Sequence, residues 1–278
     1  MSGPAQPRPA PLAPGHLLRA APTLLRVAVA EMVAYRAEIV IWILTSTLPL
    51  IMLFVWDRVA EGGPVQGFDQ AGFAAYFAAM LVVRQLAGSW VVWELNHQIR
   101  SGGLSPMLLK PLHPVAFFAA ENLGDKPIRA LVLVPIVGAI AYWRPGLVAA
   151  LDPSSLGVLL VSLLCAWGLN FAVQLCFGCL AFHLDQSVGL FKVWFGLYAL
   201  ASGYLFPLAL LPDWARVLCE QLPFRAMLAF PVEVATGLVQ GPALWRGLAL
   251  QVAWLAAALL LARWLWRSGV RRYEAFGA

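Results

Sequence analysis

The sequence predicts an all-α polytopic membrane protein with six transmembrane helices. Of the 278 residues, 61% are hydrophobic and 12% are charged, whereas soluble domains are typically about 45–50% apolar and about 25% charged. The mean hydropathy is +0.77. Because a compact soluble domain still exposes much of its surface to water, a chain this apolar is expected to have the bilayer as its solvent.

Two segments precede the first apolar run. Residues 1–16 are rich in proline and hold no apolar core of the kind found in a signal peptide, so we expect a disordered cytoplasmic tail. Residues 17–37 mix leucine and valine with arginine and glutamate. That pattern predicts a basic amphipathic helix on the membrane surface. The alternative is an N-terminal extension of the first span.

Six apolar runs approach the roughly 20 residues that a helix needs to cross the hydrocarbon layer. Pro49 interrupts the first and Pro135 the third, while the second carries a single charge at Arg84. Tryptophan stands at several ends of these runs, where its ring prefers the headgroup level. The predicted spans are Ile39–Trp56, Phe73–Trp93, Ile128–Trp143, Leu156–Phe182, Val188–Leu205 and Leu244–Trp266.

The distribution of basic residues orients these spans. If both termini are cytoplasmic, most of the 19 Lys and Arg residues lie inside, as the positive-inside rule requires. We therefore expect both termini to be cytoplasmic. The bias toward Ala, Arg, Trp and Pro suggests a GC-rich bacterial genome, and so a bacterial inner-membrane protein. The net charge of +5 follows membrane side instead of gathering on one face, which argues against a nucleic-acid partner. The only Lys or Arg residues in the segments assigned to the outside are Arg58, Arg144, Arg216, Arg225 and Arg246.

Two connections between the spans are too long to be turns. Residues 94–127 form a predicted cytoplasmic connection, and residues 206–242 a predicted extracellular one. The second is apolar and divided by four prolines. We expect it to form a hairpin of short helices that dips partway into the outer leaflet and is covered by protein where its backbone is irregular.

The cytoplasmic connection has a pattern suited to binding a partner protein. Gly102-Gly103 allows a sharp turn, and Pro111 and Pro114 end a short helix. Its apolar side chains could enter a partner's groove while its basic ones pair with an acidic rim. The alternative is a helix lying on anionic lipid headgroups. The candidate coupling residues are Glu94, Ile99, Arg100, Leu104, Leu108, Leu109 and Lys110.

The order of elements and three local sequences resemble the ABC-2 type transporter permeases. The cytoplasmic connection is similar in its Ile99-Arg100, Leu108-Leu109-Lys110-Pro111 and His113-Pro114 pattern. The segments Gly203-Tyr204-Leu205-Phe206-Pro207 and Arg271-Arg272-Tyr273-Glu274-Ala275-Phe276-Gly277-Ala278 fit the same subgroup. In that subgroup two different six-span permeases usually occur with one type of ATPase subunit. The resemblance covers residues 17–278 as one transmembrane domain.

The resemblance implies a permease subunit of an ATP-binding-cassette exporter for an amphiphilic or hydrophobic substrate. It implies a cytoplasmic ATPase partner that holds ATP and Mg²⁺, and a second permease, with a heterodimer favoured over a homodimer. The sequence itself contains no G-x-x-x-x-G-K-[ST] phosphate loop. We therefore expect this chain to be neither an enzyme nor the holder of a cofactor. Membrane lipid is a further expected partner.

Three polar residues within the predicted spans are candidates for a substrate path. A charge in the hydrocarbon layer costs roughly 2.5–3.5 kcal/mol on insertion scales, so Arg84 is expected to face protein or a water-filled path; a structural ion pair or carbonyl cap is the alternative. Asn170 and Gln174 lie one helical turn apart on a shared face. They either contact substrate or, as we favour, form hydrogen bonds between helices.

Two other classes of function are weighed against transport. His183-Leu184-Asp185 is the kind of pair that a membrane acyltransferase uses, but no second acid–base group accompanies it in the sequence. Cys176 and Cys179 have C-x-x-C spacing but lie in an apolar run, where thiols pack as small hydrophobes. The third class is a non-transporting membrane anchor for a cytoplasmic partner. Transport is the favoured prediction.

Overall fold

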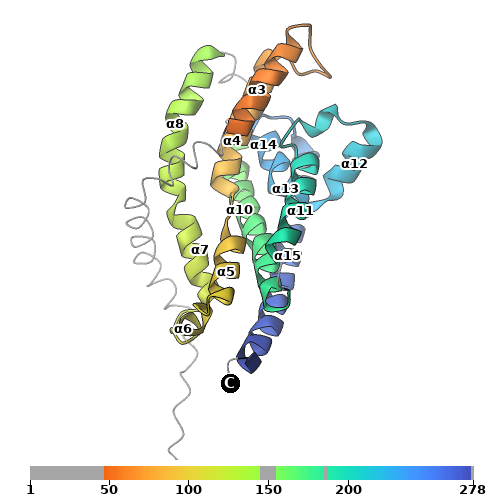
Figure 1. Ribbon diagram of the computed structural model, residues 1–278. Coiled ribbons are helices and arrows are strands. Elements are labelled where there is room, and N and C mark those ends of the chain that lie inside the picture. Colours follow the sequence, from red (N-terminus) through yellow and green to blue (C-terminus); the bar gives the residue numbers. More distant parts are fainter. Residues whose placement is uncertain (1–46, 145–154, 185–186, 277–278) are drawn as a thin grey trace, which may run out of the picture.

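The computed structural model describes residues 47–144, 155–184 and 187–276 and places them in an elongated helical bundle (Figure 1). No strand occurs in these three ranges. The predicted tail, the predicted surface helix and the start of the first predicted span lie outside the described residues. The longer helices are α3 (Thr47–Ala60), α4 (Gln70–Ala87), α5 (Val91–Arg100), α7 (Pro114–Gly124), α8 (Lys126–Trp143), α10 (Leu156–Cys179), α11 (Ser187–Ala201) and α15 (Gly241–Phe276).

Three helical stretches are long and apolar enough to cross a membrane by length and composition: Gln70–Arg100, Leu156–Phe182 and Gly241–Tyr273. The stretch Leu156–Phe182 has the bounds of the fourth predicted span, and the other two contain the second and sixth predicted spans. The apolar helix Ser187–Ala201 is shorter, and it corresponds to the fifth. The described part of α3 has 14 residues, and α8 contains Pro135. The six-span arrangement as a whole stays a prediction.

The core of the bundle surrounds α4. Its N-terminus is fixed by Asp69, whose Oδ1 accepts a hydrogen bond from the Gly72 N–H at 2.7 Å. Phe73, Tyr76 and Met80 are all at most 1% exposed. The Tyr76 hydroxyl donates to Gly203 O at 2.8 Å. Gly203 has a φ of +82°, a left-handed conformation that favours glycine, so this close approach depends on the absence of a side chain.

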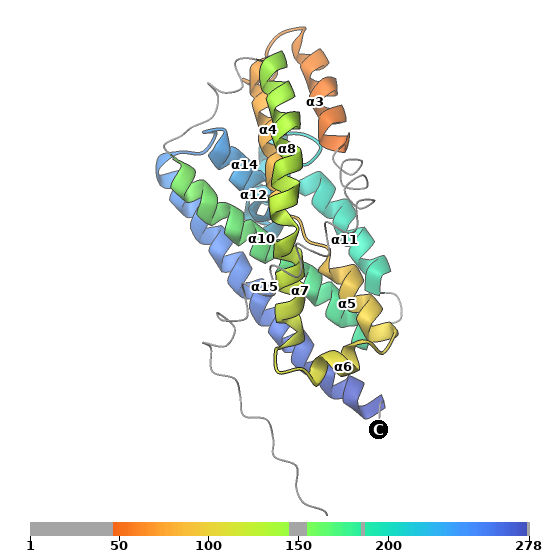
Figure 2. The same ribbon diagram turned by 90° about the vertical axis from the view of Figure 1, so that its left-hand side faces the viewer.

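The other long helices pack around this core. α10 contacts α15 along much of its length and also touches α4, α5 and the short helix α14 (Ala229–Ala235). Figures 1 and 2 show α10 and α15 side by side. In Figure 2, α8 continues upward from α7. At the end of the bundle where α3 and α8 lie close together, Arg144 Nη2 pairs with the buried Asp57 carboxylate at 2.6 Å.

The connection between α11 and α15 folds into short helices. They are η3 (Leu208–Leu210), α12 (Asp213–Gln221), α13 (Pro223–Met227) and α14 (Ala229–Ala235). α13 and α14 are inserted into the bundle, because Leu228 is fully buried and Phe230 is 1% exposed. α12 projects from the side of the bundle (Figure 1). Arg225 and Glu233 hold α13 to α14 through an ion pair of 2.6 Å.

The short helix α6 (Leu104–Leu108) lies at the same end of the bundle as the C-terminal end of α15 (Figure 1). The loop after α3 lies at the opposite end. This arrangement agrees with the predicted topology, in which α6 and the C-terminus share one side of the membrane.

Candidate functional site

The candidate span Gln70–Arg100 is broken at Gly88–Trp90, between α4 and α5. Gly88 has an extended conformation (φ −63°, ψ 151°), and its N–H donates to Arg84 O. A Cβ at Gly88 would lie 2.7 Å from that same carbonyl oxygen, so glycine is required for this close turn. Trp90 at the N-cap position of α5 gives no side-chain cap. Irregular backbone at membrane depth needs partners from surrounding protein.

Side chains from three helices supply partners for the break. Gln174 Nε2 on α10 donates to Ser89 O at 2.7 Å. Lys126 Nζ at the start of α8 donates to Gly88 O at 2.6 Å. Asn122 Nδ2 on α7 donates to the Ser89 hydroxyl oxygen at 3.3 Å. The interruption is therefore a defined, supported structure.

A buried carboxylate anchors the same region. Asp125, between α7 and α8, is 0% exposed. It pairs with Arg129 at 2.6 Å and with Lys126 at 3.4 Å, and it accepts a hydrogen bond from Trp90 Nε1 at 3.1 Å. A carboxylate out of water is tolerated when it is paired and hydrogen-bonded in this way, so Asp125 ties α8 to the helix break.

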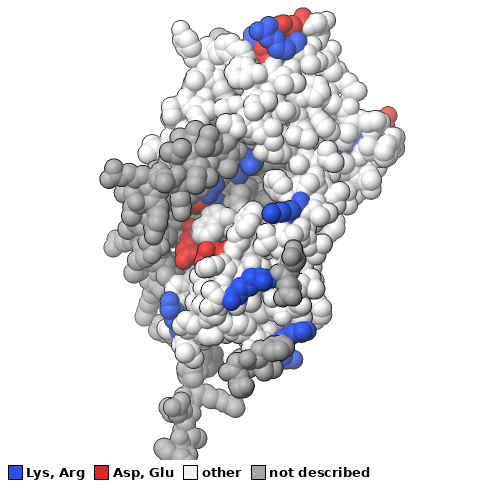
Figure 3. Space-filling model, viewed as in Figure 1, with Lys and Arg blue, Asp and Glu red and all other residues white. Residues whose placement is uncertain are grey.

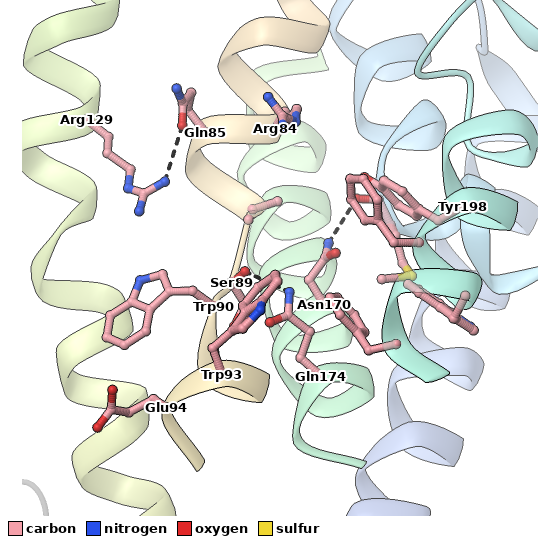
Figure 4. A pocket seen from close by; sticks show the side chains of 16 residues that line it. Arg84, Gln85, Ser89, Trp90, Trp93, Glu94, Arg129, Asn170, Gln174 and Tyr198 are labelled. Carbon is pink, nitrogen blue, oxygen red and sulfur yellow. Dashed lines mark hydrogen bonds between the residues drawn. The ribbon is translucent and has the colours of Figure 1, made fainter. Parts of the chain in front are cut away.

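A cavity of about 620 Å³ adjoins the break (Figure 4). All three predicted path residues, Arg84, Asn170 and Gln174, line it, and so does Glu94 from the predicted coupling set. Arg84 lies over the ring of Tyr204 at 4.8 Å. The structure thus brings together residues from α4, α5 and α10 that are far apart in sequence.

Asn170 and Gln174 also do what the interhelical alternative predicts. The Asn170 amide donates to Ala166 O at 2.9 Å and to Met227 O at 3.2 Å, which links α10 to α13. Gln174 links α10 to the break through Ser89. Both amides are more than nine-tenths buried. The two side chains therefore hold helices together while forming part of the cavity wall.

Aromatic side chains form a wall of the cavity that the sequence-based interpretation missed. Trp93 meets Phe191 edge to face at 5.2 Å, and Trp194 stacks on Phe191 at 6.1 Å and on Tyr198 at 5.8 Å. The positions 191, 194 and 198 recur at helical spacing, which indicates one face of α11. That spacing was the available signal, but it does not tell a cavity wall from an ordinary packing face.

The predicted coupling residues divide into two groups. Ile99 is 8% exposed and Leu104 is 0% exposed, and both belong to an apolar cluster with Phe118, Leu175 and Phe182. The prediction that Ile99 and Leu104 face a partner is therefore wrong: they pack against α7 and α10 and fix α5 and α6 in place. An amphipathic pattern marks an apolar face but does not say what covers that face.

The second group lies on the surface around α6. Leu109 is 88% exposed, Arg100 and Lys110 are exposed, and Leu108 is half-buried. Lys110 Nζ lies 5.0 Å from the centre of the Phe117 ring. α6 is also joined to α15 by a hydrogen bond, since the hydroxyls of Ser105 and Tyr273 lie 3.0 Å apart.

His113 completes this surface by starting α7. Its Nδ1 accepts a hydrogen bond from the Val115 N–H at 3.3 Å, and its ring lies 5.1 Å from that of Trp266. Burial lowers the pKa of His113 below its usual range, which keeps the imidazole neutral and able to accept this bond at pH 7.

Comparison with known proteins decides the family. A family model described as ABC-2 family transporter protein matches residues 40–277. The chain belongs to the ABC-2 transporter family. No curated protein matches the sequence. The family and the apolar helices make it a membrane protein.

In this ABC-2 family protein, one broken helix joins the two candidate regions. Its α4 half and the break line the cavity through Arg84 and Ser89, and its α5 half carries Trp93 and Glu94 along the cavity before leading into α6. α5 therefore runs from the cavity to α6. Asn96 on α5 also donates to the Ser187 hydroxyl at 2.6 Å, which links α5 to the start of α11.

The residues of the enzyme alternative do not form a site in the described part of the ABC-2 chain. His183 lies just beyond the short helix Leu180–Phe182, and Asp185 lies outside the described residues. Within those residues no group of three or more His, Cys, Asp or Glu side chains could hold a metal ion. Cys176 and Cys179 are free and buried.

Proposed function

We propose that this chain is the permease subunit of an ATP-binding-cassette exporter, moving an amphiphilic or hydrophobic substrate across the inner membrane. The observation that carries the proposal is the broken helix, which connects an exposed surface segment with a cavity inside the bundle. In transporters, discontinuous helices mark substrate sites because they free backbone groups and allow one half to move relative to the other.

The exposed surface around α6 is the proposed contact with a cytoplasmic ATPase subunit. Leu109 supplies an apolar side chain that can enter a groove, and Arg100 and Lys110 supply charge around it. The two charges would mainly set orientation and association rate. Ile99 and Leu104 lie in one apolar cluster and so join α5 to α6 on the side away from this surface.

ATP and Mg²⁺ belong to the partner in this proposal. The sequence given has no phosphate loop, so hydrolysis is assigned to the separate ATPase. ATP binding there changes the relative population of inward- and outward-facing states through differential contacts with the permease. The energy reaches the cavity through α6 and α5.

A second permease completes the path, and the subgroup resemblance favours a heterodimer. Large apolar side chains are exposed along several helices, including Leu131 and Val134 on α8, Leu164 on α10 and Val193 on α11. Such faces can contact either lipid tails, which are as apolar as leucine, or the apolar helices of a second subunit. Both termini are assigned to the cytoplasm by the distribution of Lys and Arg.

The test is a pull-down of the tagged chain from mild detergent, followed by an ATPase assay on the co-purified material. We expect an ATPase subunit with wild type and its loss with Leu109→Asp. Leu218→Asp is the matched control, because Leu218 is also exposed (56%) but lies on α12. A folded chain that binds no ATPase would contradict the proposal. An ATPase that binds but whose turnover the permease does not alter would indicate an anchor.

A further inference from the structure

We propose that the cavity beside the helix break binds the acidic head group of an amphiphile, with the apolar part of that molecule lying along the aromatic wall of α11. The inference rests on the proposed function, since it names the substrate class that such a permease would carry. It is argued from the helix terminus at the break, one unpartnered polar atom, the local charges and the aromatic wall.

The first observation is a buried helix terminus beside the cavity. α5 has 10 residues and begins at Val91 without a side-chain cap from Trp90; its first amide, the Val91 N–H, donates a long hydrogen bond of 3.4 Å to the Ser89 hydroxyl oxygen. Val91 and Val92 are at most 1% exposed, so water does not reach the first turn freely. The amides and dipole of a helix N-terminus attract negative charge. Ser89, Trp90, Trp93 and Glu94 surround this terminus and line the cavity.

The second observation is a polar atom without a partner. Gln174 is 7% exposed, and its Oε1 has no hydrogen-bond partner among the residues that the structure describes. The orientation of the amide is set by Ser89 O, which accepts from Nε2, so the remaining atom is an acceptor. Figure 4 shows Gln174 beside Ser89 and Trp93. An acidic head group that also carries an O–H or N–H donor would suit both features.

The described charges favour an anion over a cation. Arg84, Arg129 and Glu94 are the charged residues that line the cavity, two cations and one carboxylate. Arg129 and Lys126 also pair with Asp125 behind the break, and Glu94 lies in the first turn of α5. Figure 4 shows both arginines at one end of the cavity and Glu94 at the other. The space-filling view has a hollow on this face with basic side chains inside it and acidic ones at its lower edge (Figure 3). Arginine guanidinium groups match phosphate and carboxylate geometry well.

The third observation is the apolar remainder of the cavity. Phe191, Trp194, Phe195 and Tyr198 of α11 line it together with Trp93. Four of these rings contact one another at centroid distances of 5.2–6.1 Å. A rigid aromatic wall accepts an acyl chain or a ring system at little cost in side-chain entropy. Head-group charge at one end and apolar surface along the side define an anionic amphiphile.

The test measures binding of four probes to the purified protein, together with any subunits that co-purify, in neutral nanodiscs. The probes are a lysophosphatidic acid, a monoacylglycerol and an alkyltrimethylammonium of equal chain length, and inorganic phosphate. Quenching of tryptophan fluorescence is the readout. We expect the lysophosphatidic acid to bind on the order of tenfold more tightly than the uncharged or cationic amphiphile, and free phosphate to bind more weakly still.

Variants connect the binding to the cavity. Arg84→Gln and Gln174→Glu should each weaken lysophosphatidic acid binding on the order of tenfold, because one removes a positive charge and the other adds a negative one. Arg84→Lys retains the charge and should restore part of the affinity, which separates a binding role from a folding defect. Arg216→Gln is the control, since Arg216 lies on α12 away from this cavity and should not change binding.

Three results would overturn the inference. The first is that the alkyltrimethylammonium binds as tightly as the lysophosphatidic acid or more tightly, which would mean that the rings attract a cation. The second is that free phosphate binds as tightly as the lysophosphatidic acid. The third is that lysophosphatidic acid binding is unchanged in both Arg84→Gln and Gln174→Glu. The proposed function fails separately. An ATPase that co-purifies without this binding refutes the ligand class alone, and binding without any ATPase refutes the transporter.

Discussion

Two long apolar helical stretches of this protein have opposite surroundings. The stretch Gln70–Arg100 has a mean hydropathy of 1.4 in its most apolar window and is 67% buried there, whereas Gly241–Tyr273 has a hydropathy of 1.8 and is 17% buried. The less hydrophobic stretch is therefore the central one. Lipid selects apolar side chains on an outer helix, while an inner helix can hold polar groups provided that neighbouring helices supply partners.

The features on which the proposed function rests lie on the inner stretch. The inner stretch has the break at Gly88–Trp90, the cavity and the connection to α6. The outer stretch, α15, packs along α10 and exposes large side chains such as Leu260 and Trp264. Both stretches hold buried polar residues, but Gln251 on α15 donates to Ser162 O and Ala226 O and so joins helices, whereas the polar residues of the inner stretch line the cavity.

The largest effect on stability is expected where the break is anchored. Asp125→Ala removes the buried carboxylate and leaves Arg129 and Lys126 without it. We expect the free energy of unfolding to fall by about 3–5 kcal/mol, because an uncompensated buried charge is costly. Arg263→Ala on α15, where the side chain is exposed, should change it by less than about 0.5 kcal/mol. Denaturation in mild detergent measures both. Equal effects would contradict the contrast between the two stretches.

A smaller effect on stability is expected when a leucine on each of the two stretches is replaced by alanine. Leu95 on α5 is 0% exposed and packs against Gly178, where an added Cβ would meet Leu95 Cδ2 at 2.9 Å. Leu95→Ala should cost about 2 kcal/mol through the cavity that it leaves. Leu260→Ala, at a side chain 69% exposed, should cost close to nothing. The thermal unfolding midpoints of the two variants, measured in the same detergent, test this difference. A larger shift for Leu260→Ala than for Leu95→Ala would show that α15 is buried by a partner.

The smallest effect concerns one hydrogen bond at the break. Gln174→Met keeps the approximate length of the side chain but removes the donor to Ser89 O. We expect a loss of about 0.5–2 kcal/mol, since hydrogen bonds between membrane helices contribute modestly. Hydrogen exchange at residues 88–92 should become faster in this variant. Exchange unchanged at these amides would mean that Gln174 does not support the break.

The sequence predicted the position of the long helices better than their surroundings. The run Leu156–Phe182 matches a candidate span of the structure residue for residue, because hydropathy and helix length are local properties. The break at Gly88–Trp90 was not foreseen, since those residues stand inside an apolar run. It depends on Gln174, Lys126 and Asn122, which come from other helices.

The candidate site was predicted in part for the same reason. Arg84, Asn170 and Gln174 stand out as polar residues in apolar runs, and they do line one cavity. Ile99 and Leu104 were assigned to a partner surface, because their spacing marks an apolar face without revealing that α7 and α10 cover it. The buried Asp125 was missed, since a carboxylate in a predicted cytoplasmic connection gives no sign of its burial.

The central claim is that the broken helix transmits events at α6 to the cavity. Reaction of Ser89→Cys with a water-soluble maleimide, in vesicles containing the permease and its co-purified ATPase, tests it most directly. The wild-type protein, in which Cys176, Cys179 and Cys219 are buried and Cys165 is half-buried, gives the background rate to be subtracted. We predict that a non-hydrolysable ATP analogue changes the reaction rate severalfold, and that vesicles of the Leu109→Asp permease, which is expected to co-purify without the ATPase, show no such change. An equal rate with and without the nucleotide, in a complex that binds it, would contradict the account.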